Sequence, residues 1–226
     1  MRFCMPHITL TKTLENRCFL LFVSLLVLLL ATPFLFGTTL GTRLIGFLNV
    51  LILFSAVAAV ERSRFSLFVA LLLGLPALAF QLLALQSGQP GHFALCWGFG
   101  AAFYAFTIAH LLHYVLRKDV MTADKLYGAV ATYIMLAIFW AFMHGVLQYF
   151  YPGAYLYHGE PKDLNVASDL IYFSFTALTS TGFGDITPAL IYSRYLTVLE
   201  SMTGVMYVAI LIARLTGVYP VIRPKA

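Results

Sequence analysis

Charged residues are scarce in this chain. Asp, Glu, Lys and Arg make up only 10% of its 226 residues, whereas 61% are hydrophobic. A typical soluble domain carries about 25% charged residues. The composition therefore excludes an ordinary soluble protein and indicates a membrane protein with several spans.

Cysteines and repeats are also scarce. The three cysteines, Cys4, Cys18 and Cys96, are scattered and show no metal-ligand spacing, so neither a disulfide framework nor a zinc site is expected. The chain has no internal repeat and no low-complexity segment. We expect residues 216–226, which follow the last apolar run, to hold no ligand-binding domain.

Long apolar runs dominate the sequence instead. A helix needs about 20 mostly apolar residues to cross a bilayer. The sequence therefore predicts an all-α membrane protein with six transmembrane helices, at residues 18–36, 44–60, 66–85, 93–116, 126–150 and 192–215. The first run is followed by no small-x-small cleavage site, so we interpret it as a retained span and not as a signal peptide.

The segment between the last two spans, residues 151–191, is too mixed to cross a membrane. Residues 152–165 are predicted to form an exposed loop. Residues 168–179 are apolar and aromatic but too short to span, which indicates a re-entrant helix with Ser168 as its cap. Because irregular backbone at membrane depth must be buried or line a water-filled path, this pattern predicts an oligomer around a pore.

The re-entrant helix is followed by Thr179-Ser180-Thr181-Gly182-Phe183-Gly184-Asp185. Glycine permits positive-φ conformations that aim successive carbonyl oxygens the same way. A ring of such carbonyls can replace the hydration shell of a cation. The segment resembles the selectivity filter of potassium channels, Thr-x-Thr-Thr-Val-Gly-Tyr-Gly-Asp. Together with the preceding Tyr172-Phe173-Ser174-Phe175, it looks most like the two-pore-domain and small bacterial members of that superfamily.

This resemblance covers residues 126–215, which it marks as a pore domain with outer helix, pore helix, filter and inner helix. It implies a homotetrameric, potassium-selective channel that conducts passively, is not an enzyme, needs no organic cofactor and takes potassium ions as its permeant ligand. The expected filter residues are Thr179 to Asp185. Potassium is expected at Ser180, Thr181, Gly182 and Phe183.

Several residues outside the filter are candidates for supporting roles. Ungapped alignment with the family places Gly204 at the hinge of the inner helix, although a glycine there also suits close helix packing. Helical spacing puts Val205, Val208 and Ile212 on the same face, as the wall of a cavity below the filter. Thr176 and Glu200 are predicted to support the filter.

Glu200 is the one acidic residue well inside a predicted span. An ionisable group at such depth is a functional candidate by default. We expect it to be buried behind the filter, to form hydrogen bonds with the hydroxyl groups of Thr176, Thr179 and Thr181, and to make conduction depend on pH. His110, His113 and His144 are interpreted as packing or interfacial histidines.

The positive charges are distributed unevenly among the predicted loops. Eleven of the 14 Lys and Arg residues fall on one side of the membrane, at positions 2, 12, 17, 62, 64, 117, 118, 125, 214, 223 and 225. The positive-inside rule then places both termini in the cytoplasm. The net charge of +5 is explained by these loops, so no nucleic-acid partner is expected.

The sequence thus divides into a cytoplasmic N-terminus (1–17), a four-helix scaffold (18–116), a linker (117–125), the pore domain (126–215) and a short tail (216–226). The expected partners are the lipid bilayer, further copies of the chain and monovalent cations, in a cell membrane, with a bacterial inner membrane favoured. Three alternatives remain open. The first is a non-selective or sodium-permeable cation channel, because Thr181 and Phe183 depart from the usual filter. The second is a membrane enzyme that uses the intramembrane histidines, and the third is a regulatory subunit of other channels.

Overall fold

The computed structural model describes residues 17–35, 39–59, 64–117 and 120–218. Five helices come first, and a sixth long helix ends the described chain. Their bounds are α2 (Arg17–Leu35), α3 (Thr39–Ala59), α4 (Arg64–Ser87), α5 (Pro90–Val115), α6 (Ala123–Phe150) and α8 (Ile191–Val218). Between α6 and α8 lie three short strands and a short helix.

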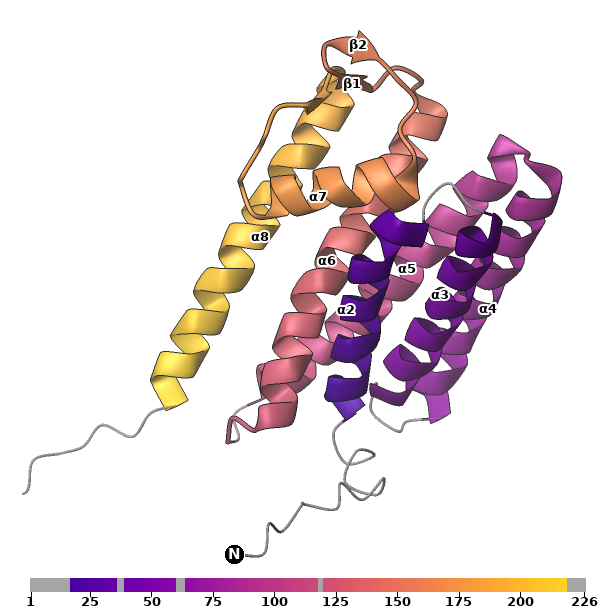
Figure 1. Ribbon diagram of the computed structural model, residues 1–226. Coiled ribbons are helices and arrows are strands. Elements are labelled where there is room, and N and C mark those ends of the chain that lie inside the picture. The colour runs from indigo at the N-terminus through magenta and orange to yellow at the C-terminus, as the bar shows by residue number, and fades with distance from the viewer. Residues whose placement is uncertain (1–16, 36–38, 60–63, 118–119, 219–226) are drawn as a thin grey trace, which may run out of the picture.

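The long helices run side by side (Figure 1). Helix α2 packs on α3 and α6, α5 packs on α4 and α6, and α8 lies at one edge against α6. The strands all lie at one end of the bundle, which we call the strand end. At the opposite end, the Asp124 carboxylate accepts hydrogen bonds from Cys18 N and the Tyr114 hydroxyl, which ties α2 and α5 to the start of α6.

Five of these helices are long and apolar enough to cross a membrane, namely α2, α4, α5, α6 and α8. Helix α3 contributes a shorter apolar stretch, Leu48–Val57, among its described residues. The structure therefore agrees with an all-α membrane protein. The helices run beyond the predicted spans: α6 begins inside the predicted linker, and α8 continues into the predicted tail.

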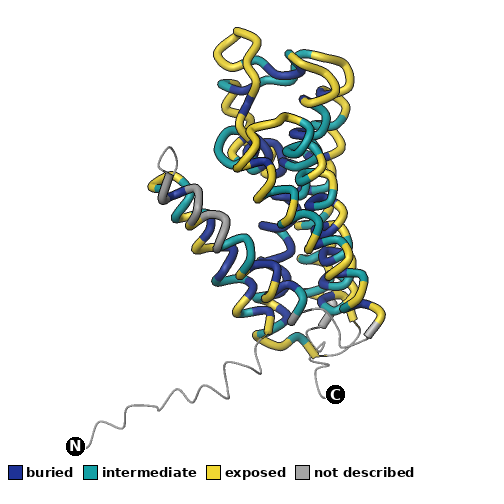
Figure 2. The backbone as a smooth tube through the Cα atoms, turned by 90° about the vertical axis from the view of Figure 1, so that its right-hand side faces the viewer, coloured by how far each residue is buried: buried dark blue, intermediate teal, exposed yellow. Residues whose placement is uncertain are grey.

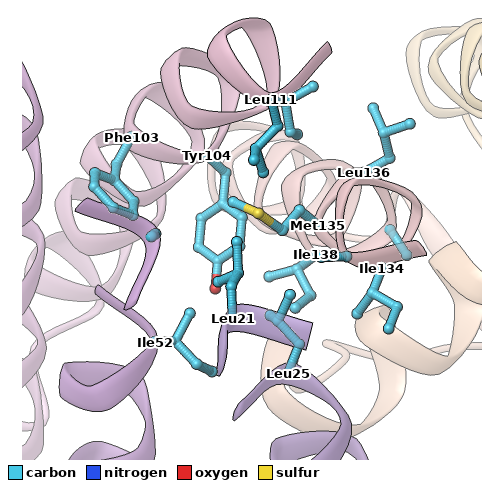
Figure 3. Close-up of a cluster of buried hydrophobic side chains, with 14 of the residues drawn as sticks. Leu21, Leu25, Ile52, Phe103, Tyr104, Leu111, Ile134, Met135, Leu136 and Ile138 are labelled. Atoms are coloured by element: carbon cyan, nitrogen blue, oxygen red, sulfur yellow. The ribbon is translucent and has the colours of Figure 1, made fainter. Parts of the chain in front are cut away.

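A large apolar core holds α2, α3, α5 and α6 together (Figure 3). Leu21 and Leu25 from α2, Tyr104 from α5 and Met135 from α6 are nearly or completely buried there. Burial of such side chains removes apolar area from water or lipid and fills the space between helices at close packing. Figure 2 shows buried residues inside the helix column, whereas exposed residues follow the loop at the strand end.

The strand end carries a three-stranded antiparallel sheet of order β2-β1-β3, from β1 (Tyr155–Tyr157), β2 (Glu160–Pro161) and β3 (Ile186–Pro188). His158 and Gly159 both have positive φ and form the two-residue turn between β1 and β2. The prediction of an exposed loop over residues 152–165 was therefore partly wrong. Tyr155, the first residue of β1, is fully buried, and its ring packs on the ring of Phe173.

The short helix has two parts, the π-helical turn η1 (Val166–Leu170) and α7 (Ile171–Leu178). Its N-cap is Asn165, whose side chain accepts a hydrogen bond from Ala167 N, so the predicted cap at Ser168 was wrong. Ser168 lies inside the first turn and donates to the Asp169 carboxylate. Figure 1 shows α7 lying across the bundle between α6 and α8, after which the chain returns to the strand end.

Candidate functional site

The backbone after α7 alternates in conformation. Ser180, Gly182 and Gly184 have φ values of 55°, 54° and 83°, and neither Thr181 nor Phe183 between them has a positive φ. Ser180 is one of only two non-glycine residues with positive φ in the described part of the chain. Such alternation turns successive peptide groups so that their carbonyls can face one side. This segment, residues 180–184, is also exposed in the single chain.

The end of α7 holds this segment through backbone hydrogen bonds. The carbonyl oxygen of Thr176 accepts bonds from Thr181 N at 2.8 Å and Gly182 N at 3.2 Å. The carbonyl of Ala177 accepts one from Ser180 N at 2.9 Å. The Thr176 hydroxyl donates instead to Phe173 O within the helix. Thr176 therefore contacts the segment through its main chain and not, as expected, through its hydroxyl.

The Thr181 hydroxyl has a partner within its own segment. Its Oγ1 lies 2.8 Å from Oγ1 of Thr179, which also donates to Phe175 O at 2.7 Å. The hydroxyl that replaces a methyl group of the usual valine is thus satisfied locally. The expected hydrogen bonds from Thr179 and Thr181 to Glu200 are not found among the described residues, because these two hydroxyls bond to each other.

The far end of the segment is fixed by an aromatic pair and by the sheet. The rings of Phe183 and Tyr172 are stacked, with centroids 6.2 Å apart and an interplanar angle of 2°. The Tyr172 phenol interacts with the Asp185 carboxylate. The Asp185 carbonyl accepts a hydrogen bond from His158 N at 2.8 Å. Tyr172 therefore contacts the Phe183 ring and lies near the Asp185 carboxylate at this end of the segment.

Helix α8 approaches α7 most closely at Gly204. A Cβ atom on Gly204 would lie 1.9 Å from the carbonyl oxygen of Leu178, so only glycine fits there. One turn earlier, the Ser201 hydroxyl donates to Ala177 O at 2.9 Å. Of the two interpretations of this glycine, the structure directly supports close packing. Its role as a hinge stays a prediction.

The other face of α8 is apolar and exposed in the single chain. Val205, Val208 and Ile212, the predicted cavity wall, are 58%, 43% and 55% exposed. Further exposed apolar side chains on α8 are Tyr195, Val198, Leu199, Met202, Met206 and Ile210. A helix with so little of its apolar surface covered needs lipid or another protein chain around it.

Three buried polar side chains, which we call the polar chain, are linked to one another behind α7. Glu200 Oε2 is 2.8 Å from His144 Nε2, and His144 Nδ1 is 2.5 Å from the Tyr155 hydroxyl. All three side chains are 0% exposed. The Phe173 ring of α7 packs edge-on against the His144 ring at 5.2 Å. The Ser174 hydroxyl and the second carboxylate oxygen of Glu200, Oε1, are also buried here, and neither has a hydrogen-bond partner within the described part of the chain.

This arrangement corrects two expectations from sequence. Glu200 is buried, but its partner is His144 and not a threonine. Tyr155 lies in the segment predicted to be exposed, and its burial raises the pKa of its phenol above the ordinary value of 10.0, with the nearby Glu200 charge adding to the shift. One sequence signal could have found the pair, because His144 is the one histidine within the apolar run 126–150.

The other two histidines of the enzyme alternative lie elsewhere. His110 in α5 bonds through Nδ1 to Phe106 O and through Nε2 to the Ser66 hydroxyl. His113 is exposed. In the described part of the chain, no three residues among His, Cys, Asp and Glu form a group that could hold a metal ion.

Comparison with protein families gives one match, and it covers the same part of the chain. Residues 129–219, which hold most of α6 and every later element through α8, match a family model described as an ion channel. The match spans less than half of the 226 residues. No curated protein and no solved structure matches the chain. The match and the apolar helices together support a multi-pass membrane protein with an ion channel domain, and such a domain suggests a protein that is not an enzyme.

Proposed function

We propose that the protein is a potassium-selective channel whose pore is lined by the backbone carbonyls of Ser180 to Gly184. The observation that carries this proposal is the alternation of positive φ at Ser180, Gly182 and Gly184. Carbonyls aligned in this way can replace the water around a dehydrated cation. The Ser180 hydroxyl adds an oxygen at the end nearest α7.

The proposed channel is a homotetramer. One chain offers one strand of carbonyls, and several strands are needed to surround an ion. Two features support further copies around the strand: residues 180–184 are exposed in the single chain, and α8 presents an uncovered apolar face. Four copies follow from the resemblance of the filter to that of potassium channels.

We further propose an orientation of the channel in the membrane and a passive mode of conduction. The six helices α2 to α6 and α8 all span the membrane, α7 is a re-entrant pore helix, and both termini lie in the cytoplasm of a cell with a bacterial-type inner membrane. Conduction is passive and needs no organic cofactor. Voltage dependence is weak, because α5 contains no Lys or Arg that could move through the field.

A sodium-permeable pore is the second candidate. It is favoured by Thr181 and Phe183, because a hydroxyl pair and a ring without a phenol replace the usual bracing of the filter. The two candidates differ in ion ranking. A potassium-selective pore passes potassium and rubidium and excludes sodium, whereas the second candidate passes sodium at a similar rate.

The decisive test is ion flux from liposomes that contain the purified protein. The wild type should release potassium. Gly184→Ala should abolish the release, because a Cβ disfavours the φ of 83° that the strand requires. Gly88→Ala is a matched control, because Gly88 has a φ of 64° but lies between α4 and α5. Undiminished flux through a folded Gly184→Ala oligomer would refute the proposal.

A further inference from the structure

A cavity of about 530 Å³ lies between the N-terminal helices and the start of α7. Helices α2 to α6 contribute to its walls, and residues 163–167, from the loop before η1 and the start of η1, form part of the lining at the strand end. Ligand pockets for small molecules typically measure about 300–1,000 Å³. The cavity is therefore of a size that binds a ligand, and neither the filter nor the polar chain behind α7 uses it.

The walls of the cavity are largely apolar and aromatic, with Phe93, Trp97, Phe103, Tyr104 and Phe142 among them. The helices meet tightly at two of its glycines. A Cβ on Gly74 would lie 2.3 Å from Leu53 Cδ1, and one on Gly100 would lie 2.9 Å from Phe142. Close helix contacts thus bound the space at these two points, and its walls suit an apolar chain.

Besides Asn165 in the loop before η1, two amide side chains from the helices interrupt the apolar lining. Asn49 from α3 and Gln81 from α4 both line the cavity and are half-buried. Neither has a hydrogen-bond partner among the described residues. An amide without a partner in apolar surroundings is costly. These two amides mark polar positions within the otherwise apolar walls of the cavity.

The strand end of the cavity carries the charge. Asp163 is the only Asp, Glu, Lys or Arg among the described lining residues. The neighbouring Lys162 is engaged elsewhere, with its Nζ 4.3 Å from the centroid of the Tyr157 ring. A cationic head group therefore fits this end. A phospholipid head fits less well, because its phosphate would stand beside the Asp163 carboxylate.

We propose that this cavity binds a single-chain amphiphile with a protonated amine head, its chain among the aromatic side chains and its head at Asp163. The bound molecule contacts Val166, Ala167 and Ile171, at the beginning of η1 and α7. Its binding is independent of the proposed function. Only an effect of binding on ion flux rests on the proposal that α7 supports the pore.

The two tryptophans allow a direct test of binding. Trp97 lines the cavity and Trp140 does not, so the Trp140→Phe variant leaves one reporter in place. The protein is placed in phosphatidylcholine nanodiscs and titrated with dodecylamine that carries bromine on its chain, since bromine quenches tryptophan fluorescence on contact. We expect saturable quenching that unlabelled dodecylamine reverses.

Two substitutions in α4 separate the cavity from the surrounding lipid. Ala77→Phe fills the cavity and should remove the saturable component, whereas Ala79→Phe, on the exposed side of the same helix, should leave it unchanged. Circular dichroism and size-exclusion chromatography check that both variants are folded. Quenching that never saturates, or that is equal in both variants, reports partition into bulk lipid and overturns the proposal.

Head-group specificity is tested in the same assay. Asp163→Asn should weaken binding of the amine about threefold, as expected for a partly exposed ion pair, and leave brominated dodecanol unaffected. Equal affinity of amine and alcohol for the wild type would overturn the cationic assignment. Phosphatidylethanolamine in the nanodiscs should not displace the probe, and displacement would show that the occupant is a phospholipid. These binding results do not depend on ion flux, so a failure of the liposome test would refute the proposed channel function and not the proposed binding site.

Discussion

His144 on α6 and Glu200 on α8 meet side chain to side chain, with 2.8 Å between Nε2 and Oε2 and no exposed surface on either residue. The pair joins the two helices that flank α7. Removal of one partner from such a buried pair costs far more than the pair itself contributes, because the other polar group is left without a hydrogen bond.

We therefore expect Glu200→Ala to lower the stability of the protein by about 3–5 kcal/mol. Glu200→Gln keeps an acceptor for His144 but cannot ionise, so it should keep the fold and flatten the pH response of ion flux. Thermal unfolding and flux between pH 5 and pH 8 measure the two effects. Leu126→Ala, at an exposed position of α6, is the control. Unchanged stability and pH response in Glu200→Ala would show that the pair is dispensable.

Tyr155 provides a prediction at high pH. The raised pKa of Tyr155 means that the folded state holds the phenol neutral. The contribution of this phenol to folding stability is therefore fully present below pH 10.0, and it is lost as the pH rises through the folded-state pKa. The wild type should lose thermal stability above about pH 10 more steeply than Tyr155→Phe. At pH 7 the variant should be less stable by about 1–3 kcal/mol, because His144 Nδ1 loses its partner. Parallel curves for the two proteins would contradict this account.

Gly204→Ala should separate α8 from the end of α7. The added Cβ would overlap the backbone oxygen of Leu178, and overpacking of this kind costs about 1–3 kcal/mol. Gly98→Ala is the matched control, because Gly98 lies within helix α5 and a Cβ there meets nothing within 4 Å. Thermal unfolding should show a loss for the first variant and none for the second, which gains helix propensity.

The stacked pair of Phe183 and Tyr172 should matter for ion selection. Phe183→Ala removes the stacking, which is worth about 0.5–1.5 kcal/mol and corresponds to roughly a two- to tenfold change in an equilibrium. We expect the ratio of potassium to sodium flux to fall by that factor. Phe183→Tyr keeps the ring and should keep the ratio. If the alanine variant discriminates as well as the wild type, the ring plays no part in selection.

The exposed face of α8 predicts that the purified protein is not a monomer. Native mass spectrometry in detergent should give about four times the mass of the 25.1 kDa chain. Val205→Glu places a charge on this apolar face and should shift the population towards smaller assemblies. Val130→Glu, at an exposed position of α6, serves as the control. A mass of two chains would refute the tetramer.

Hydropathy alone locates the long helices, because membrane spans are specified by local composition. The sequence of residues 179–185 likewise predicts the backbone conformation of this segment, since two of its three positive-φ positions are glycines. The partner of Glu200 escaped prediction, because His144 is 56 positions away and only the fold brings them together. Tyr155 escaped because its neighbours, Gly153, His158 and Gly159, are turn residues that are typical of an exposed loop.

The hydrogen bonds at the two ends of residues 180–185 have a consequence for assembly. Thr176 O and Ala177 O hold one end, and His158 N holds the other, all from the same chain. In the proposed oligomer, each subunit would therefore hold this strand through its own hydrogen bonds, without contacts from another subunit. Association of such subunits would lose less backbone entropy at the contact, so the proposed oligomer should form faster and more tightly than one whose central strands become ordered only on contact.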